Sequence, residues 1–162
     1  MARAPMTIVF RPATVDAGDG ALLAQAMRDE IAAIYDGLDL DGAHMPRAGA
    51  AELSPPTGAF LVGYHDDAPV CCGGVKRLDD RHCEIKRMYV VPELRGRGVA
   101  RTLLHELEDT ARRLGYDVAR LDTGPRQPGA RALYVSEGYE EIANFNANPV
   151  AAFWGEKSLR LG

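Results

Sequence analysis

The feature that most constrains this chain is a strand that runs through a glycine-containing turn directly into a helix. Residues 82–91 form a β-prone run, and residues 96–114 carry apolar side chains at helical spacing. The free N–H groups and positive dipole end at the start of such a helix favour an anion. Three arginines can add charge-assisted bonds to that anion: Arg95, Arg97 and Arg101. The segment therefore predicts a phosphate-binding turn.

Two well-known phosphate loops fit this turn poorly. A P-loop requires GxxxxGK[ST], and no such lysine follows the glycines. A dinucleotide fold requires GxGxxG within βαβ units, but Arg101 takes the place of the third glycine and the preceding strands resemble hairpins. A nicotinamide-dependent oxidoreductase is therefore disfavoured. A solvated basic turn with no ligand remains an alternative.

Composition and length narrow the class of protein. The 162 residues fit one domain, 1–162, with 46% hydrophobic and 26% charged residues, as in ordinary globular chains. The net charge of −4 gives no basic footprint for nucleic acid, and no apolar run approaches a membrane span or signal peptide. We therefore expect a cytoplasmic protein that binds neither nucleic acid nor membrane.

The cysteines and histidines show no ligand spacing. Cys71, Cys72 and Cys83 lack a CxxC pattern, and the four histidines lack paired spacing, so neither a disulfide framework nor a metal site is expected. The cysteines are interpreted as small buried hydrophobes in strands.

Periodicity and turn residues predict ten elements in the order β-α-β-β-β-α-β-α-β-β. The strands are expected at 6–12, 59–67, 68–78, 82–91, 117–124, 139–145 and 151–161, and the helices at 20–35, 96–114 and 128–137. Residues 36–58 are expected to form a long loop with a short helical turn near 48–53.

Two motifs together resemble a known family. The first is RxxGxA, from Arg95 to Ala100, preceded by V-x-P in residues 90–92. The second runs from Gln127 to Tyr139 and is similar to N-x-x-A-x-x-L-Y-x-x-x-G-F. Both resemble the acyl-CoA-binding motifs of the GNAT superfamily of N-acetyltransferases. The resemblance implies an α/β (α+β) fold with a mixed, mainly antiparallel central sheet of six to seven strands flanked by helices.

The resemblance also implies an activity and a binding site. The expected activity is acetyl transfer from acetyl-CoA to a primary amine of a small molecule or peptide, by direct attack on the thioester; the alternative is a non-catalytic acyl-CoA-binding sensor or regulatory module. Strand backbone would pair with the pantetheine arm, and amides of the turn would hold the pyrophosphate. The expected acetyl-CoA-binding residues are Met88, Tyr89, Val90, Arg95, Gly96, Arg97, Gly98, Val99, Ala100, Arg101 and Gln127, the last standing where the family commonly has asparagine.

Two residues are candidates for the proton transfers. Tyr134 matches a family tyrosine that protonates the leaving thiolate; the alternative is a helix tyrosine packed against the sheet. Glu84 matches a family general base and is expected on the same strand face as Met88, four residues on. Its alternative is pairing with Lys86, Arg87 or Arg77 on an exposed sheet face. Lesser candidates for the base are Tyr35, Glu52 and Tyr89.

The sequence says little about the acceptor. Residues 20–58 and the last two strands are expected to bind it. Acidic residues in that first segment could steer an amine or a basic peptide, or form a solvated surface: Asp29, Glu30, Asp36, Asp39, Asp41 and Glu52. Phe145, Phe153 and Trp154 are interpreted as core residues, or as a pocket wall or homodimer contact.

Overall fold

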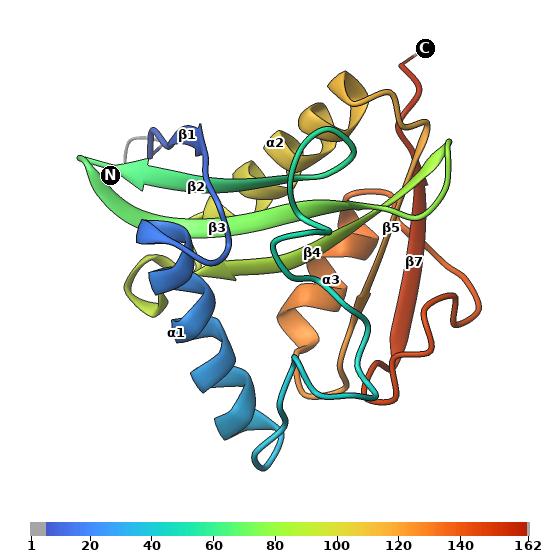
Figure 1. The fold of residues 1–162 in the computed structure, drawn as a ribbon, viewed down its shortest axis with the longest axis horizontal. Coiled ribbons are helices and arrows are strands. Elements are labelled where there is room, and N and C mark those ends of the chain that lie inside the picture. The colour runs from blue at the N-terminus through green and yellow to red at the C-terminus, as the bar shows by residue number, and fades with distance from the viewer. Residues whose placement is uncertain (1–5, 162) are drawn as a thin grey trace.

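A computed structural model describes residues 6–161 of the chain, with the predicted element order (Figure 1). Its strands and helices are β1 (Val9–Pro12), α1 (Gly18–Ile34), β2 (Ala59–His65), β3 (Ala68–Arg77), β4 (His82–Val90), α2 (Val99–Arg113), β5 (Val118–Thr123), α3 (Pro128–Ser136), β6 (Glu140–Glu141) and β7 (Phe153–Ser158). A short 3₁₀ turn, η1 (Pro92–Leu94), precedes α2.

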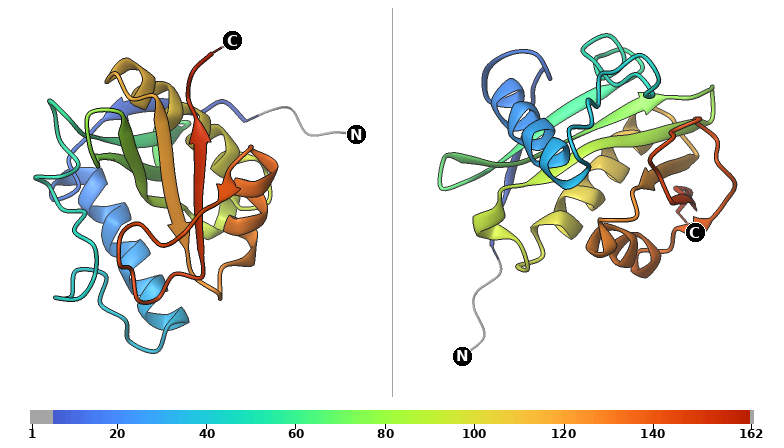
Figure 2. Two further views of the ribbon diagram at one scale, coloured as in Figure 1. Left: turned by 90° about the vertical axis from the view of Figure 1, so that its right-hand side faces the viewer. Right: turned by 90° about the horizontal axis from the view of Figure 1, so that it is seen from below.

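The strands form one mixed sheet in the order β1-β2-β3-β4-β5-β7-β6. Every neighbouring pair is antiparallel except β4 and β5, which run parallel. Helix α1 and the loop after it cover one face, and α2 and α3 cover the other (Figures 1 and 2). The predicted fold class, a mainly antiparallel sheet of six to seven strands with helices on both faces, is confirmed.

The β2–β3 hairpin closes through Asp66 and Asp67, which have φ angles of 48° and 65°. A two-residue hairpin turn with both residues left-handed matches the twist of its strands, and aspartate tolerates that conformation. Strand β4 pairs antiparallel with β3 in turn, so the three strands are joined as hairpins, as the sequence predicted.

Helix α2 begins three residues later than predicted. Gly98 has a φ of 83° and lies just before the helix, so the regular helical conformation can start only at Val99. The leucines Leu103, Leu104 and Leu107 are fully buried against the sheet. Gly115, with a φ of 97°, ends the helix as predicted.

Strand β6 is much shorter than the predicted 139–145. After Glu141, side chains of three asparagines accept hydrogen bonds from backbone N–H groups two or three residues ahead, at 2.8 to 3.1 Å: Asn144, Asn146 and Asn148. These local bonds replace ladder pairing and fold the segment into a loop.

Each helix face buries its own hydrophobic cluster. Cys71 and Cys83 belong to the cluster under α2, and Cys72 to the cluster under α1. Burial raises the pKa of each of the three thiols to about 12, which confirms their interpretation as buried hydrophobes. The long loop after α1 contains a single helical turn, in which Leu53 donates its N–H to the Gly49 carbonyl at 3.0 Å. The Leu53 side chain is buried in the α1 cluster.

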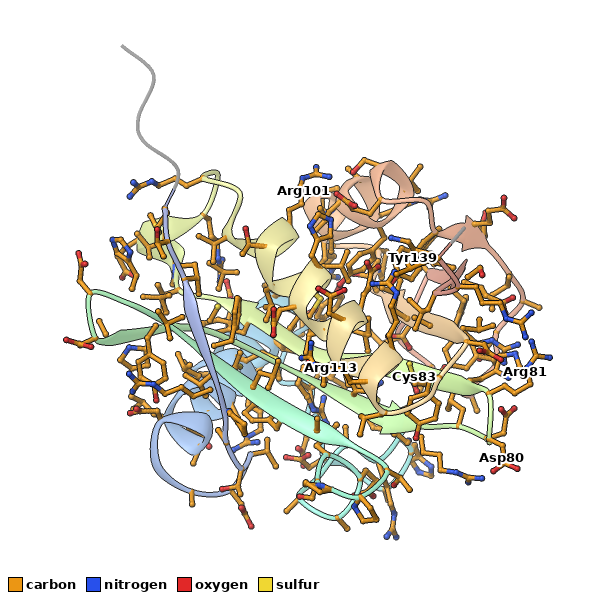
Figure 3. The ribbon with its side chains drawn as sticks, turned by 90° about the horizontal axis from the view of Figure 1, so that it is seen from above. Asp80, Arg81, Cys83, Arg101, Arg113 and Tyr139 are labelled. Carbon is orange, nitrogen blue, oxygen red and sulfur yellow. The ribbon has the colours of Figure 1, made fainter. Side chains whose placement is uncertain are left out.

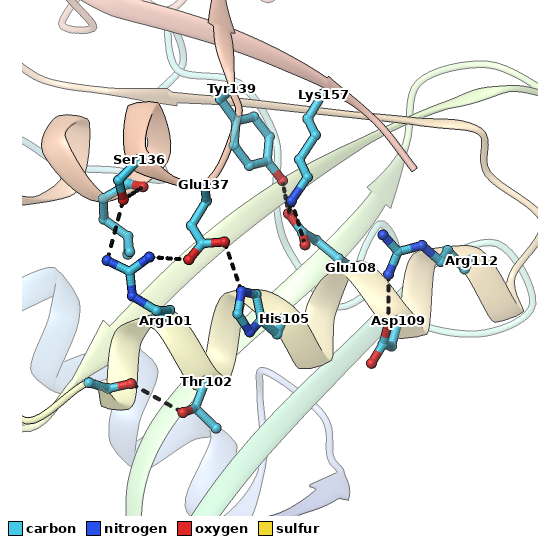
Figure 4. Close-up of polar contacts among 12 residues, drawn as sticks. Arg101, Thr102, His105, Glu108, Asp109, Arg112, Ser136, Glu137, Tyr139 and Lys157 are labelled. Carbon is cyan, nitrogen blue, oxygen red and sulfur yellow. Dashed lines mark hydrogen bonds and ion pairs between the residues drawn. The ribbon is translucent and has the colours of Figure 1, made fainter. Parts of the chain in front are cut away.

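Polar contacts tie α2 to α3 and β7 (Figure 4). The buried carboxylate of Glu108 accepts hydrogen bonds from the Tyr139 hydroxyl at 2.7 Å and from Lys157 at 3.0 Å. Nearer the start of α2, Glu137 binds both Arg101 and His105. Figure 3 shows Arg101, near this start, well separated from Asp80 and Arg81 of the β3–β4 turn.

Between residues 6 and 161, no helix is long and apolar enough to span a membrane. The same residues contain no cluster of three or more His, Cys, Asp or Glu side chains arranged to hold a metal.

Candidate active site

Strands β4 and β5 separate after their first three paired residues. The parallel register runs only from His82 to Glu84 on β4, and within the described chain residues 85–90 pair with β3 alone. A cavity of about 480 Å³ opens between the diverging strands. Its walls come from β4, the end of β5, α3, α1 with the loop after it, the start of α2 and the loop before β7. One edge of β4 therefore presents backbone groups to this cavity.

A β-bulge interrupts β4 beside the cavity. Cys72 pairs with Tyr89 and Gly74 with Lys86, so two residues of β4 oppose the single residue Gly73. One of these two, Arg87, has a φ of 59°. An extra residue reverses the alternation of side chains beyond it.

The bulge corrects one prediction. Glu84 pairs with Lys86, whose cross-strand neighbour Gly74 faces Leu53 on the α1 side. Met88 instead packs with the α2 leucines around Gly73. Glu84 and Met88 therefore lie on opposite faces, and the prediction of a shared face, which assumed a regular strand, is wrong.

The turn before α2 presents free backbone donors. The six amides from Gly96 to Arg101 have no hydrogen-bond acceptor among the described residues, and the first bond of the helix joins Thr102 to Gly98 at 3.1 Å. Gly96 and Gly98 have φ angles of 77° and 83°, with open space around each α-carbon. Glycine is needed here for the backbone conformation that turns these amides outward.

The three arginines of the turn have different surroundings. Arg95 forms a bidentate pair with Glu30 of α1 at 2.6 and 2.7 Å, and its Nε donates to the Val90 carbonyl at 2.9 Å. Arg101 is paired with Glu137. Arg97 is exposed and has no ion-pair partner among the described residues. Arg97 is thus the arginine whose charge is free for a ligand.

Tyr134 of α3 is buried, faces the cavity and donates its hydroxyl to the Met88 sulfur at 3.8 Å. Burial, reinforced by the nearby charge of Asp122, raises the pKa of the phenol. The phenol therefore keeps its proton at neutral pH. Tyr134 is both a cavity residue and, as the alternative interpretation held, a helix tyrosine packed against the sheet.

Glu84 is fully buried and is not among the residues that line the cavity. Its Oε2 accepts a hydrogen bond from Asn146 at 2.9 Å and lies 3.2 Å from the Lys86 ammonium, whereas Oε1 has no partner. Burial raises the pKa of this carboxyl. The predicted pairing with Lys86 exists, but inside the protein and not on an exposed face.

The structure brings to the cavity three charged residues that the sequence analysis did not assign to the site. Asp122 of β5 lines it, and its Oδ2 accepts hydrogen bonds from Asn146 at 2.7 Å and Asn148 at 2.9 Å. Lys86 and Arg87 line it from β4. The only sequence signal for Asp122 was a carboxylate near the end of a strand that is followed by a glycine. The divergence of β4 from β5, which opens the cavity to Asp122, cannot be predicted from neighbouring residues.

The far wall of the cavity is closed by a contact between α1 and the β5–α3 loop. Tyr35 donates its hydroxyl to the side chain of Gln127 at 3.1 Å and accepts the Arg126 N–H at 3.2 Å. The Arg126 guanidinium donates to the Ile34 carbonyl at 2.7 Å. The Gln127 amide is thus already engaged with α1.

The remaining predicted residues divide into two groups. Tyr35, Tyr89 and Glu30 line the cavity, whereas Glu52 lines a separate hollow in the long loop. Several acidic side chains of the first segment are paired with arginines: Glu30, Asp36 and Asp41. Of the aromatic residues near the C-terminus, Phe153 is a core residue, as interpreted, and none lines the cavity.

Comparisons with known proteins agree with this geometry. The chain is 33% identical over 115 residues to an uncharacterized N-acetyltransferase of Bacillus subtilis (strain 168), covering 67% of this chain and 76% of that protein. It is 35% identical over 111 residues to an IAA acetyltransferase of Azospirillum brasilense, covering 66% and 72%.

A GNAT family acetyltransferase of Elizabethkingia anophelis, solved with acetyl-CoA bound, shares the fold. Its TM-score is 0.62 at 16% identity, covering 93% of this chain and 97% of that one. The model of the acetyltransferase (GNAT) family matches residues 24–139, which include both diverging strands, the turn and α3. This chain therefore belongs to the GNAT acetyltransferase family.

Proposed function

We propose that this protein is an acetyl-CoA-dependent N-acetyltransferase that acts on a primary amine of a small molecule or peptide. The observation that carries the proposal is the row of six unbonded amides at the start of α2, beside the open edge of β4. Membership of an acetyltransferase family supports it.

The residues fit the donor by the chemistry of their free groups. Amides from Gly96 to Arg101, with the positive end of the helix dipole, suit a pyrophosphate, and the free Arg97 side chain can add charge. The unpaired edge of residues 85–90 suits an extended amide-containing arm, as an added strand would. Bound there, acetyl-CoA would supply an acetyl thioester to the cavity.

The reaction needs a base at the attacking amine and an acid at the departing sulfur of that thioester. Asp122 faces the cavity and can take a proton from an acceptor ammonium, which frees the nitrogen lone pair for attack. Tyr134 holds a proton beside the Met88 sulfur and can give it to the departing sulfur. Glu84 is a second candidate for the base, linked to Asp122 through Asn146.

The test couples binding to turnover. Calorimetric titration with CoA should give saturable binding, and release of free thiol from acetyl-CoA should require an added amine. No heat and no thermal stabilisation at millimolar CoA would contradict the proposal. Tight CoA binding without transfer to any amine or peptide would instead favour a binding or regulatory module.

A matched pair of variants localises the donor site. Ala100→Asp puts a carboxylate among the free amides and should abolish CoA binding. Because Ala100 is partly buried against the α2 core, thermal unfolding of the variant should show that it is still folded. Ala132→Asp, exposed on α3 and away from the cavity, is the control and should bind CoA normally.

A further inference from the structure

The charged residues that line the cavity are not equally satisfied. Glu30 and Arg95 form a bidentate pair. Lys86 lies 3.2 Å from the buried Glu84. Arg126 contacts Asp36 at 3.2 Å and also the Ile34 carbonyl. Two oppositely charged residues of the cavity, Arg87 and Asp122, have only a long ion-pair contact or no ion-pair contact among the described residues.

The first of these is Arg87, whose side chain is only 8% exposed. Its one polar contact within the described chain is a long 3.4 Å approach to Asp41. That carboxylate is 54% exposed and also lies 3.6 Å from Arg28. A guanidinium has five N–H donors, so most of those on Arg87 have no protein acceptor. None of these donors is sealed from solvent, so the free N–H groups of Arg87 are open to a ligand in the cavity.

The second is Asp122, which has no ion-pair partner among residues 6–161. Its Oδ2 is held by the amides of Asn146 and Asn148, so the carboxylate is fixed in orientation. Its Oδ1 has no hydrogen bond and is not sealed from solvent, unlike the Oε1 of Glu84. An oriented carboxylate with one free oxygen suits an ammonium.

We propose that the acceptor carries both charges: it is an amino acid with an apolar side chain, its carboxylate bound by Arg87 and its amino group by Asp122. A zwitterion satisfies both groups at once, whereas a simple amine leaves the buried guanidinium unpaired. Apolar residues that line the same cavity suit the side chain: Ile34, Leu38, Leu40 and Met45. This inference rests on the proposed acetyl transfer and names its substrate class.

Three matched acceptors test it. Leucine, leucinamide and 3-methylbutylamine share an amine and an apolar chain but differ in the carboxylate. Leucine should be acetylated with a kcat/KM about 10- to 100-fold above the other two, the range expected for a charge-assisted contact. Equal use of leucinamide, or a preference for it, would overturn the proposal.

Variants assign the preference to one side chain. Arg87→Gln should lower the ratio of kcat/KM for leucine to kcat/KM for leucinamide toward one. It should do so by raising the KM for leucine, with CoA affinity unchanged. Arg87→Lys, which keeps the charge, should retain part of the ratio. Asp41→Asn should hold or raise the ratio, because Asp41 competes for the same guanidinium. Arg160→Gln, at an exposed pair with Asp117, is the control.

A binding measurement separates this inference from the failure of catalysis. Leucine and leucinamide are titrated calorimetrically into the protein saturated with CoA, which requires no turnover. Tighter binding of leucine that is lost in Arg87→Gln supports the carboxylate site even if no transfer occurs. Weakened CoA binding in Arg87→Gln would assign Arg87 to the donor and refute the inference, as would equal affinity for the two ligands.

Discussion

The conformation of Gly98 can be tested by a single methyl group. An alanine at this position meets no atom within 4 Å, so any cost arises from the backbone, whose φ is 83°. Left-handed alanine costs about 1 to 2 kcal/mol. The reduced freedom of the unfolded chain offsets roughly 0.4 to 1 kcal/mol of that. Gly98→Ala should therefore lower the free energy of unfolding by about 1 kcal/mol.

Gly129 provides a control of opposite sign. It lies in the first turn of α3, and an added methyl group there also meets open space. Because its backbone is helical, Gly129→Ala should raise the free energy of unfolding by about 0.5 kcal/mol. Urea denaturation of the free protein measures both values, and the Gly98 variant should melt roughly 2 to 4 °C lower than the natural protein.

The same change should weaken the donor site. Relaxation of residue 98 toward negative φ would turn amides of the α2 start away from a common point, and losing one bond to a charged group costs about 1.5 to 3 kcal/mol. CoA affinity should fall at least about tenfold in Gly98→Ala. Unchanged stability together with unchanged CoA affinity would refute the idea that a left-handed residue 98 aims these amides.

Three further changes probe separate parts of the molecule. Tyr134→Phe should lower kcat for thiol release about 10- to 100-fold with little change in the KM for acetyl-CoA, whereas Tyr64→Phe, outside the cavity, should not. Lys157→Met should destabilise the protein by about 3 kcal/mol in urea, because it strips the buried Glu108 of its cation; a loss below about 1 kcal/mol would contradict this. The His105 imidazole and the neighbouring guanidinium hold the pKa of Glu137 below its usual value, so its stabilisation is present at neutral pH and is lost as the pH falls through that lowered pKa. Glu137→Gln should therefore cost up to about 1 kcal/mol at pH 7 and progressively less below pH 4, measured by thermal unfolding across pH.

Most of the fold was predictable because its signals are local. The apolar stripe of α2, the terminating Gly115 and the aspartate turn of the β2–β3 hairpin each depend on a few adjacent residues. The turn before α2 was predictable for the same reason, because its glycines and the start of the helix are adjacent in the sequence. Strand β6 was overestimated because side chains of the asparagine loop compete with ladder pairing, and periodicity does not register that competition.

The site was less predictable because it depends on the relation between distant segments. The bulge at Arg87 inverts side-chain direction with no glycine or proline on β4 itself; the glycine that accompanies it, Gly73, lies on the neighbouring strand β3. Asp122 reaches the cavity because β5 leaves β4, a property of neither strand alone. The ion pair considered for Glu84 was expected on the surface, but packing of the surrounding elements buries its carboxyl completely. Two of these three effects arise from packing between elements and not from local pattern.

The divergence of β4 from β5 also has a consequence for the protein without its ligand. Sheets ordinarily confine their unpaired backbone to the outer strands, where a neighbouring chain can add to them. Here an unpaired edge lies in the middle of the sheet, on the side of β4 that faces β5. The amides of residues 85–90 that point into the cavity should exchange with deuterium faster than their neighbours on the same strand, and donor binding should slow them. If the proposed donor binds along this edge, its extended arm would complete a sheet that is incomplete at its centre.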